Sequence, residues 1–207
     1  AGGHKVTVLD TMWFGDGYLP QDNGSLVVIK GDVRDSEKYV DAAQGKDAIL
    51  WLSSISNNAM YSVNRVLTRA VNTFVWPGGK RFIYASSAAV MDPTSDYARD
   101  KLFCEAVLSQ SEAVIVRSAS VCGYSPNMRF DTTINRMVHD HHKNGIIKVA
   151  GGDQYRTHVS IKDISRFYQH LCEMNDFPYG STFNVVSDNQ TVRASAELIG
   201  AYETGPR

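Results

Sequence analysis

Short apolar runs alternate along the first 120 residues with longer segments whose apolar positions recur every three or four residues. The short runs are rich in β-branched and aromatic side chains, which is typical of buried strands. They cover residues 5–9, 26–29, 48–52, 81–85 and 113–117. Strands that alternate with helices in this way predict an α/β fold, a Rossmann-type doubly wound parallel sheet.

The helical segments carry apolar stripes that face one side. The clearest stripe is formed by Val63, Val66, Leu67, Ala70, Val71 and Phe74. Its spacing is that of one face of an amphipathic helix. A second helix is predicted over residues 36–44, with Ser36 as its N-cap, and a third begins near Tyr97.

The texture changes after Val121, where loop residues become frequent. Helices are predicted at 131–143, 163–174 and 192–202, and short strands at 146–150 and 182–186. We expect a main domain of residues 1–121 plus about 161–180. A small lobe would comprise about 122–160 and 181–207.

Composition narrows the class of protein. The net charge is −1, and no apolar run approaches 18 residues, so neither nucleic acid nor a membrane is expected as a partner. The three cysteines, Cys104, Cys122 and Cys172, have no metal or redox spacing. A dispersed, odd set suits reduced thiols, and we expect a soluble, cytoplasmic protein.

Three side chains that could perform chemistry follow the predicted strand 81–85. Ser87 comes at its C-terminal end, where ligands bind in open α/β sheets. Tyr97 and Lys101 are four apart, which places them on one helical face. A nearby ammonium favours the phenolate, which could take a proton from an alcohol while hydride leaves the same carbon. The alternative is a solvated lysine beside a half-buried tyrosine.

Polar residues also end the earlier strands. Asp10 could bind the ribose diol of NAD, and its charge would repel the 2′-phosphate of NADP. Asp32 and Val33 could hold the adenine edge. Ser53 and Ser54 would lie beside the pyrophosphate. Each of these residues could instead simply form a turn.

Two further groups of residues are candidate ligand sites. Residues 139–142 read His-Asp-His-His, but no third metal ligand is indicated, so we expect a solvated helix end and no metal. Arg129 and Arg156 could clamp a diphosphate through bidentate hydrogen bonds. The alternative for each arginine is an ordinary surface position.

In this order, the pieces resemble the extended short-chain dehydrogenase/reductases. The nearer branch is the NAD-dependent nucleotide-sugar epimerase/dehydratase family, with most likeness to UDP-sugar 4-epimerases. The motifs lie at residues 3–10, 31–35, 51–54, 61–64, 86–90, 97–101, 116–123 and 154–163. The resemblance implies that the main domain binds NAD and that the small lobe binds a nucleotide sugar.

The resemblance also assigns roles to single residues. Ser87, Tyr97 and Lys101 match the catalytic pattern. The implied cofactor-binding residues are Asp10, Asp32, Val33, Leu52, Ser53, Ser54, Asn64, Tyr97, Lys101 and Val121. Arg156 is similar to an arginine that holds the substrate diphosphate. A homodimer is implied through the 60–74 helix and the Tyr97 helix, which carries Leu102, Phe103, Ala106 and Val107.

One position favours epimerisation within this family. Many dehydratases carry a glutamate two residues after the active Ser/Thr, and here that position is Ala89. An NAD-dependent C4 epimerisation is therefore favoured. The alternatives are a dehydratase or ketoreductase of the same fold, and a non-catalytic nucleotide-binding or regulatory protein.

The chain also departs from the family pattern. The first strand and the glycine-rich turn that cradles the pyrophosphate are not found in residues 1–207, and the loops after Ser54 and Ser87 are short. All of these pieces line one cleft in the family. We therefore expect that the sequence joins ordered segments of a longer protein.

Overall fold

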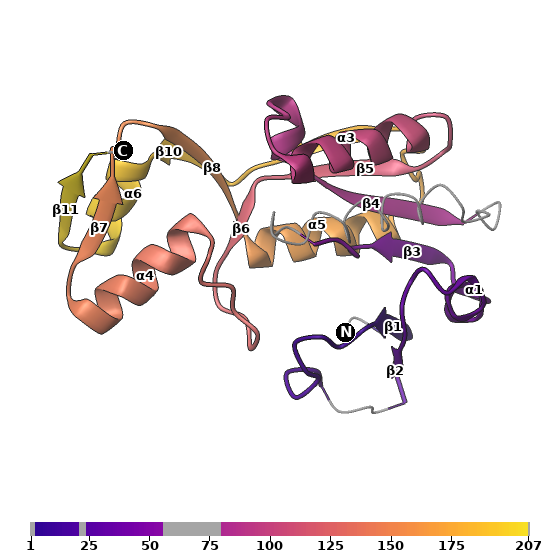
Figure 1. The fold of residues 1–207 in the computed structure, drawn as a ribbon. Helices are drawn as coiled ribbons and strands as arrows, with labels where there is room; N and C mark the ends of the chain where they lie inside the picture. Colours follow the sequence, from indigo (N-terminus) through magenta and orange to yellow (C-terminus); the bar gives the residue numbers. More distant parts are fainter. Residues whose placement is uncertain (1–2, 21–23, 56–79, 207) are drawn as a thin grey trace. The chain divides into compact units, whose positions relative to one another are not determined.

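The computed structural model describes residues 3–20, 24–55 and 80–206 (Figure 1). Its contacts divide the chain into two compact units. The first unit comprises residues 1–86, 90–115 and 178–181, and the second comprises 87–89, 116–177 and 182–207. The predicted helix at 63–74 lies outside the described residues.

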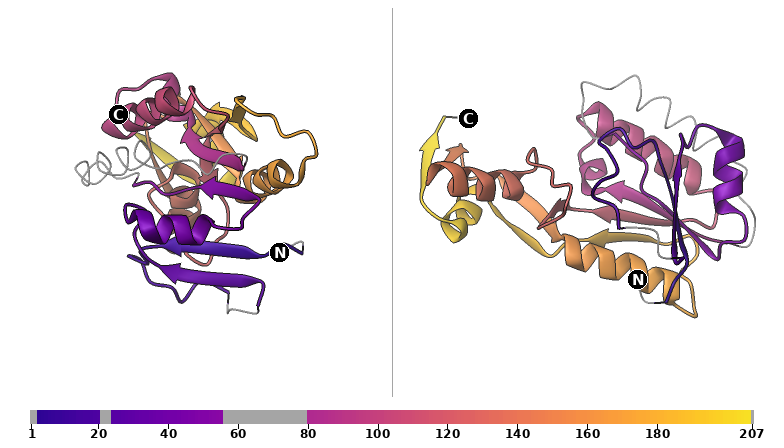
Figure 2. Two further views of the ribbon diagram at one scale, coloured as in Figure 1. Left: turned by 90° about the vertical axis from the view of Figure 1, so that its right-hand side faces the viewer. Right: turned by 90° about the horizontal axis from the view of Figure 1, so that it is seen from below.

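The first unit contains parallel strands with helices between them. Its elements are β1 (Val6–Asp10), β2 (Leu26–Lys30), α1 (Ser36–Ala43), β3 (Ala48–Trp51), β4 (Arg81–Ser87) and α3 (Asp96–Leu108). β1 and β2 pair in parallel and lie side by side in Figure 2. β3 and β4 also pair in parallel, in a second sheet with the order β3-β4-β5-β9. The predicted α/β class with parallel sheets is confirmed.

Apolar side chains from both sheets and from two helices form the core of the first unit. The cluster contains Val33, Tyr39, Ala43, Trp51, Phe82, Tyr84, Cys104, Leu108, Ala113 and Ile115. Leu9 and Ile49 pack against it. Cys104 and Leu108 come from α3, so this helix packs its buried side against β4 through the core.

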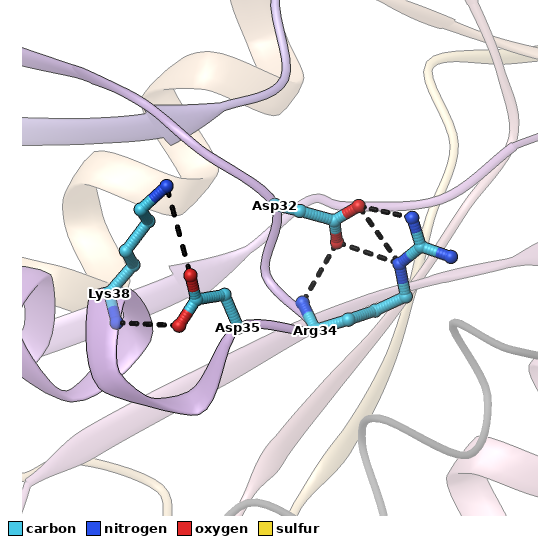
Figure 3. A network of polar contacts seen from close by, with 4 residues as sticks. All are labelled: Asp32, Arg34, Asp35 and Lys38. Atoms are coloured by element: carbon cyan, nitrogen blue, oxygen red, sulfur yellow. Dashed lines mark hydrogen bonds and ion pairs between the residues drawn. The ribbon is translucent and has the colours of Figure 1, made fainter.

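The start of α1 corrects one prediction. The N-cap is Asp35, and Ser36 is the first helical residue. The Asp35 carboxylate accepts a hydrogen bond of 3.3 Å from the Lys38 backbone N–H and pairs with the Lys38 ammonium at 3.7 Å (Figure 3). A carboxylate satisfies an unpaired N–H and also interacts favourably with the helix dipole.

The second unit is built from short strands and three helices. Its largest segment begins within β5 (Val114–Ser118), because residues 114–115 belong to the first unit and 116–118 to the second. Its elements are β6 (Ser120–Cys122), α4 (Thr133–Asn144), β7 (Ile147–Ala150), β8 (Tyr155–Ser160), α5 (Ile161–Glu173), β9 (Thr182–Val185), β10 (Asp188–Thr191), α6 (Val192–Ile199) and β11 (Tyr202–Gly205). α4, α6, β7 and β11 lie together in Figure 1, and β11 pairs with β7.

Several of these strands were not predicted. β8 pairs with β6 in parallel and with β10 in antiparallel fashion. The last helix was predicted to reach Tyr202, but α6 ends at Ile199 and Tyr202 begins β11, which pairs with β7. Gly200 separates the two elements, and the His141 ring occupies the space that a Cβ there would need. Packing against α4 therefore supports the end of the helix.

The two units do not coincide with the predicted domains, because residues 161–177 group with the second unit. Compactness does not say which unit binds which ligand, so the domain assignment stays a prediction. Within the described ranges, no helix is long and apolar enough to cross a membrane.

Candidate active site

The C-terminal end of β4 presents two serines to different surroundings. The strand extends to Ser87, two residues further than predicted. Ser86 is buried, and its hydroxyl donates a hydrogen bond of 2.5 Å to Glu105 Oε1 on α3. Ser87 is half-buried, and its Oγ accepts a hydrogen bond of 3.2 Å from the Ala89 N–H. Accepting this bond leaves the Ser87 hydroxyl proton available for donation to a ligand.

Helix α3 begins so that Tyr97 lies in its first turn. Ser95 is the N-cap, and its hydroxyl accepts a hydrogen bond of 3.1 Å from the Ala98 N–H. Tyr97 is half-buried, and Lys101 follows one turn later. An N-cap hydroxyl stabilises a helix start by roughly 1 kcal/mol, so the cap fixes where the Tyr-x-x-x-Lys pair stands on the helix.

Lys101 is buried, with 5% of its surface exposed. Its Nζ donates a hydrogen bond of 2.6 Å to the Ala85 carbonyl and lies 4.8 Å from the centroid of the Tyr84 ring. The same Nζ lies 5.9 Å from the centroid of the Tyr97 ring. The predicted proximity of Tyr97 and Lys101 is confirmed, and the alternative of a solvated lysine is excluded.

Burial changes the acid–base behaviour of this lysine. It lowers the pKa of the Lys101 ammonium to about 8, and negative charge on Cys104 and Glu105 opposes the fall. A group with that pKa is still protonated about ten to one at pH 7. Lys101 therefore offers a positive charge beside the Tyr97 phenol, and such a charge favours the phenolate.

The second tyrosine near the ammonium has a different character. Burial, and then the surrounding Cys104, Tyr97 and Glu105, raise the pKa of the Tyr84 phenol well above its ordinary value. Tyr84 stays protonated at neutral pH and belongs to the core. Of the two phenols beside Lys101, Tyr97 is therefore the candidate base.

Sequence reasoning missed Ser86 and Glu105. Both are buried, at 4% and 5% exposure, and they bond each other. One signal was present, because Glu105 stands four residues after Lys101 and shares its helical face. A carboxylate on the face that also carries Cys104 and Leu108 is unusual, since glutamate is almost never buried without a partner.

The predicted ribose-binding residue ends β1. Asp10 is exposed, and its Oδ1 accepts a hydrogen bond of 2.7 Å from the Met12 N–H. Met12 has a φ of 57°, the left-handed region, so the carboxylate supports a tight turn. Asp10 pairs in register with Lys30 at the end of β2, so both strands present their carboxyl ends at one edge.

The predicted adenine turn follows β2 and is held by an ion pair (Figure 3). Arg34 Nε donates to both Asp32 oxygens at 2.9 Å, and its Nη2 contacts Oδ2. The Asp32 Oδ1 also accepts from the Arg34 N–H at 2.9 Å. These hydrogen bonds hold the pKa of the Asp32 carboxyl below its ordinary value. Val33 packs its side chain into the core, so the predicted contact to adenine would have to come from its backbone.

β3 runs parallel to β4 and ends three residues earlier in the register. Trp51 pairs in register with Tyr84, so the residues that follow each strand leave the sheet at the same edge. Leu52 and Ser54 are exposed and Ser53 is half-buried. The Ser53 carbonyl accepts a hydrogen bond of 3.2 Å from the Trp51 indole.

These strand ends suit a dinucleotide. Acids end β1 and follow β2, and hydroxyls follow β3 and end β4, which are the positions of the predicted NAD contacts. Val121 is half-buried in β6, and Asn64 lies outside the described residues. Ser87 belongs to the second unit, whereas Tyr97 and Lys101 belong to the first. The meeting of all three side chains, and the cofactor contacts, stay predictions.

The two candidate diphosphate ligands are exposed residues of the second unit. Arg129 Nε donates to Asp131 Oδ1 at 2.9 Å, and its carbonyl accepts a bond of 2.9 Å from Asn135. Arg156 Nη1 donates to the Tyr155 carbonyl at 2.9 Å. A diphosphate would have to compete with Asp131 for Arg129, and both roles stay predictions.

The histidine-rich end of α4 makes contacts of its own. The His139 ring packs against Phe130 in a tilted arrangement with ring centroids 4.7 Å apart, and it approaches the Asp140 carboxylate at 3.4 Å. Asp140 pairs with Arg136 at 2.8 Å. Within the described residues, no group of three His, Cys, Asp or Glu side chains could hold a metal ion. Among the described residues, Cys104, Cys122 and Cys172 form no disulfide bond.

Comparison with known proteins places this geometry in context. A family model described as the NAD dependent epimerase/dehydratase family matches residues 3–185. Solved structures match almost the whole chain. An epimerase from Methanothermobacter thermautotrophicus has a TM-score of 0.80 at 18% identity, over 98% of this chain and 73% of that one.

Other matches include both reaction types. The UDP-glucuronic acid 4-epimerase from Bacillus cereus, in complex with NAD, has a TM-score of 0.72 at 17% identity, over 99% of this chain and 80% of that one. The dTDP-glucose 4,6-dehydratase from Bacillus anthracis, also in complex with NAD, has a TM-score of 0.76 at 16% identity, over 99% and 77%. At these identities the likeness concerns the fold.

Proposed function

The chain belongs to the NAD-dependent epimerase/dehydratase family, and from that premise we propose that it epimerises a nucleotide-diphosphate sugar at C4 through a transient keto intermediate. The observation that carries the proposal is the buried Lys101 ammonium, 5.9 Å from the Tyr97 ring. A tyrosine so placed is a candidate base at neutral pH.

The reaction needs one proton to leave a substrate hydroxyl and later return. Tyr97, as the phenolate, takes this proton, and Lys101 stabilises the charged form of the base. Ser87 holds the substrate oxygen by donating a hydrogen bond. NAD, when bound, would supply the hydride acceptor for the same carbon and the hydride donor for its opposite face.

Epimerisation is favoured over dehydration because of Ala89. It is the second residue of a short helix (Ala88–Met91) that directly follows Ser87. Many dehydratases of this family carry a glutamate at this position, where an acid/base is needed to eliminate water. A methyl group cannot transfer a proton, so this position supports a reaction without elimination.

The substrate side of the proposal rests on Arg129 and Arg156. Both arginines are exposed residues of the second unit, and their guanidinium groups can bind diphosphate oxygens bidentately. We propose that this unit supplies the nucleotide-sugar contacts. Among the structural relatives, one is described in complex with UDP-glucose and NAD.

The test is a product analysis with pairs of UDP-hexoses that differ only at C4, incubated with added NAD. Interconversion of the pair in both directions is the expected result. A product lighter by one water would show a dehydratase. Binding of NAD without turnover of either sugar would support a non-catalytic protein instead.

A further inference from the structure

Three polar side chains are buried where α3 crosses the end of β4. Lys101 and Glu105 are each 5% exposed, and Ser86 is 4% exposed. Burying an ion costs several kcal/mol unless it is paired and hydrogen-bonded, so a lysine and a glutamate at one site call for a physical explanation. The proton transfer proposed for Tyr97 uses Lys101 but gives Glu105 no role.

Two adjacent hydrogen bonds join the helix to the strand. The Lys101 Nζ donates to the Ala85 carbonyl at 2.6 Å, and the Ser86 hydroxyl donates to Glu105 Oε1 at 2.5 Å. Neighbouring residues of β4 thus hold residues one turn apart on α3. Because Lys101 and Glu105 are spaced by four, their side chains share the helical face that meets the strand.

We propose that Glu105, held by Ser86, is the positioning residue that keeps the Lys101 ammonium charged inside the protein. The purpose of that charge rests on the function proposed above, since the ammonium supports the phenolate of Tyr97. The electrostatic link between Lys101 and Glu105 does not depend on any activity.

The surroundings of Lys101 support this role. The titratable groups near its Nζ are Tyr84 from β4, and Tyr97, Cys104 and Glu105 from α3. Burial lowers the pKa of Lys101, while Cys104 and Glu105 oppose the fall. Of these two side chains, Glu105 is the one whose carboxylate accepts a hydrogen bond of 2.5 Å from Ser86, the residue that follows Ala85, the strand partner of Lys101.

The direct test is a ¹³C NMR titration of the lysine ε-carbons, with the Lys101 signal identified by its loss in Lys101→Met. In the wild-type protein we expect a midpoint of about 8. In Glu105→Gln we expect the midpoint to fall by about one pH unit, a tenfold loss of proton affinity. The matched control is Glu112→Gln, the same change at an exposed position of the same unit, which should leave the midpoint unchanged.

The variants are chosen so that the protein should still fold and the Lys101 midpoint can be measured. The glutamine amide oxygen can still accept the Ser86 hydrogen bond, so only the charge is removed. If Glu105→Gln does not fold, the double variant Ser86→Ala with Glu105→Met removes both the charge and the hydroxyl that it satisfies. This double variant should lower the Lys101 midpoint at least as far as is expected for Glu105→Gln.

Two results would overturn the inference. One is an unchanged Lys101 midpoint in the charge-removing variant that folds. The other is a midpoint that falls in Cys104→Ala but not in Glu105→Gln, which would assign the role to the thiol. A purely structural Glu105 would lower the melting temperature without moving the midpoint.

This test separates the inference from the function. If the wild type converts no UDP-hexose but the midpoint still moves, the proposed function fails and the role of Glu105 stands. If the protein is an active epimerase, the alkaline limb of kcat/KM against pH should move with the midpoint in Glu105→Gln. Glu105→Asp, which restores the charge, should return that limb toward its wild-type position.

Discussion

The first unit contains two groups of charged side chains that use similar chemistry and differ in their access to water. At the turn after β2, Asp32 pairs with Arg34, and their side chains are 29% and 40% exposed. Between α3 and β4, Lys101 and Glu105 are each 5% exposed. Water screens the first pair, so it contributes at most about 1 kcal/mol, as exposed ion pairs generally do.

The buried group behaves differently because desolvation acts on each charge. It brings the pKa of Lys101 to about 8, close to the pH at which the protein would work. The exposed pair only reinforces a charge that Asp32 would carry anyway. We therefore expect acid–base chemistry at α3. At the turn after β2 we expect ligand binding by a side chain whose charge does not change near neutral pH. The following variants test this contrast, from the largest expected effect to the smallest.

Replacement of Tyr97 by phenylalanine should have the largest effect. The change removes the phenol oxygen, so the proton transfer is lost and turnover should fall by about 10²- to 10⁴-fold or more. NAD binding should remain nearly intact, because the ring stays in place. Turnover of the UDP-hexose and NAD affinity by calorimetry should be measured side by side. Retained turnover would remove Tyr97 from the mechanism.

Lys101→Met should lower both turnover and NAD affinity. The ammonium supports the phenolate, and Lys101 is also one of the implied NAD-binding residues, so its loss acts on chemistry and on binding. We expect about a tenfold weaker NAD complex, the loss of roughly one hydrogen bond to a charged group. NAD affinity equal to that of the wild type would contradict the second role.

The exposed face of α3 should be one of the two helical surfaces that each protomer contributes to a homodimer interface. Leu102 and Phe103 are 38% and 49% exposed on a helix whose other side is in the core. The partner helix predicted at 60–74 lies outside the described residues. Phe103→Glu should convert the dimer to a monomer in light scattering at micromolar concentration.

A matched control for the dimer is available on α1. Val40 is 51% exposed in the same unit, and Val40→Glu makes the same change away from α3. This variant should remain dimeric. A wild-type protein that is monomeric at micromolar concentration would refute the predicted assembly.

His158 extends the contrast to the second unit. It is 4% exposed, and neither ring nitrogen has a hydrogen-bond partner among the described residues. Burial lowers the pKa of its imidazole, an effect opposed by Asp188 and reinforced by Arg156. The unfolded chain therefore binds this proton at higher pH than the folded protein. Stability should fall as pH drops below about 6.5, by at most about 1.4 kcal/mol per pH unit.

The variant His158→Phe should remove this pH dependence. Melting temperatures between pH 7 and pH 5 should fall less steeply in the variant than in the wild type. His142→Phe is the control, because His142 is exposed at the end of α4. Equal slopes in His158→Phe and the wild type would show that His158 does not titrate with folding.

Arg34→Ala should have the smallest effect. The Asp32–Arg34 pair is exposed, so its loss should lower the free energy of unfolding by less than about 1 kcal/mol, and less still at high salt. Urea unfolding at two salt concentrations measures this. If the free energy of unfolding falls by more than about 2 kcal/mol at both salt concentrations, the Asp32–Arg34 pair is shielded from water as the buried Lys101 and Glu105 are.

Local sequence determined much of this protein. The apolar runs at 48–52 and 81–85 form parallel strands within a residue or two of the prediction, because buried strands need consecutive β-branched and aromatic residues. The spacing of Tyr97 and Lys101 placed both on one face of α3, since helical periodicity is a local property. The positions of Asp10 at the end of β1 and of Asp32 just after β2 could be predicted because the apolar run that precedes each of them is also a local pattern.

Tertiary structure decided what depends on distant partners. β8 contains polar residues and becomes a strand because β6 and β10 pair with it. β11 forms beside β7, where the local pattern predicted the end of a helix. The burial of Glu105 and Ser86 follows from the packing of α3 on β4, which no local spacing specifies. Desolvation depends on everything that surrounds a group, so only the folded protein makes Lys101 a lysine with a pKa of about 8.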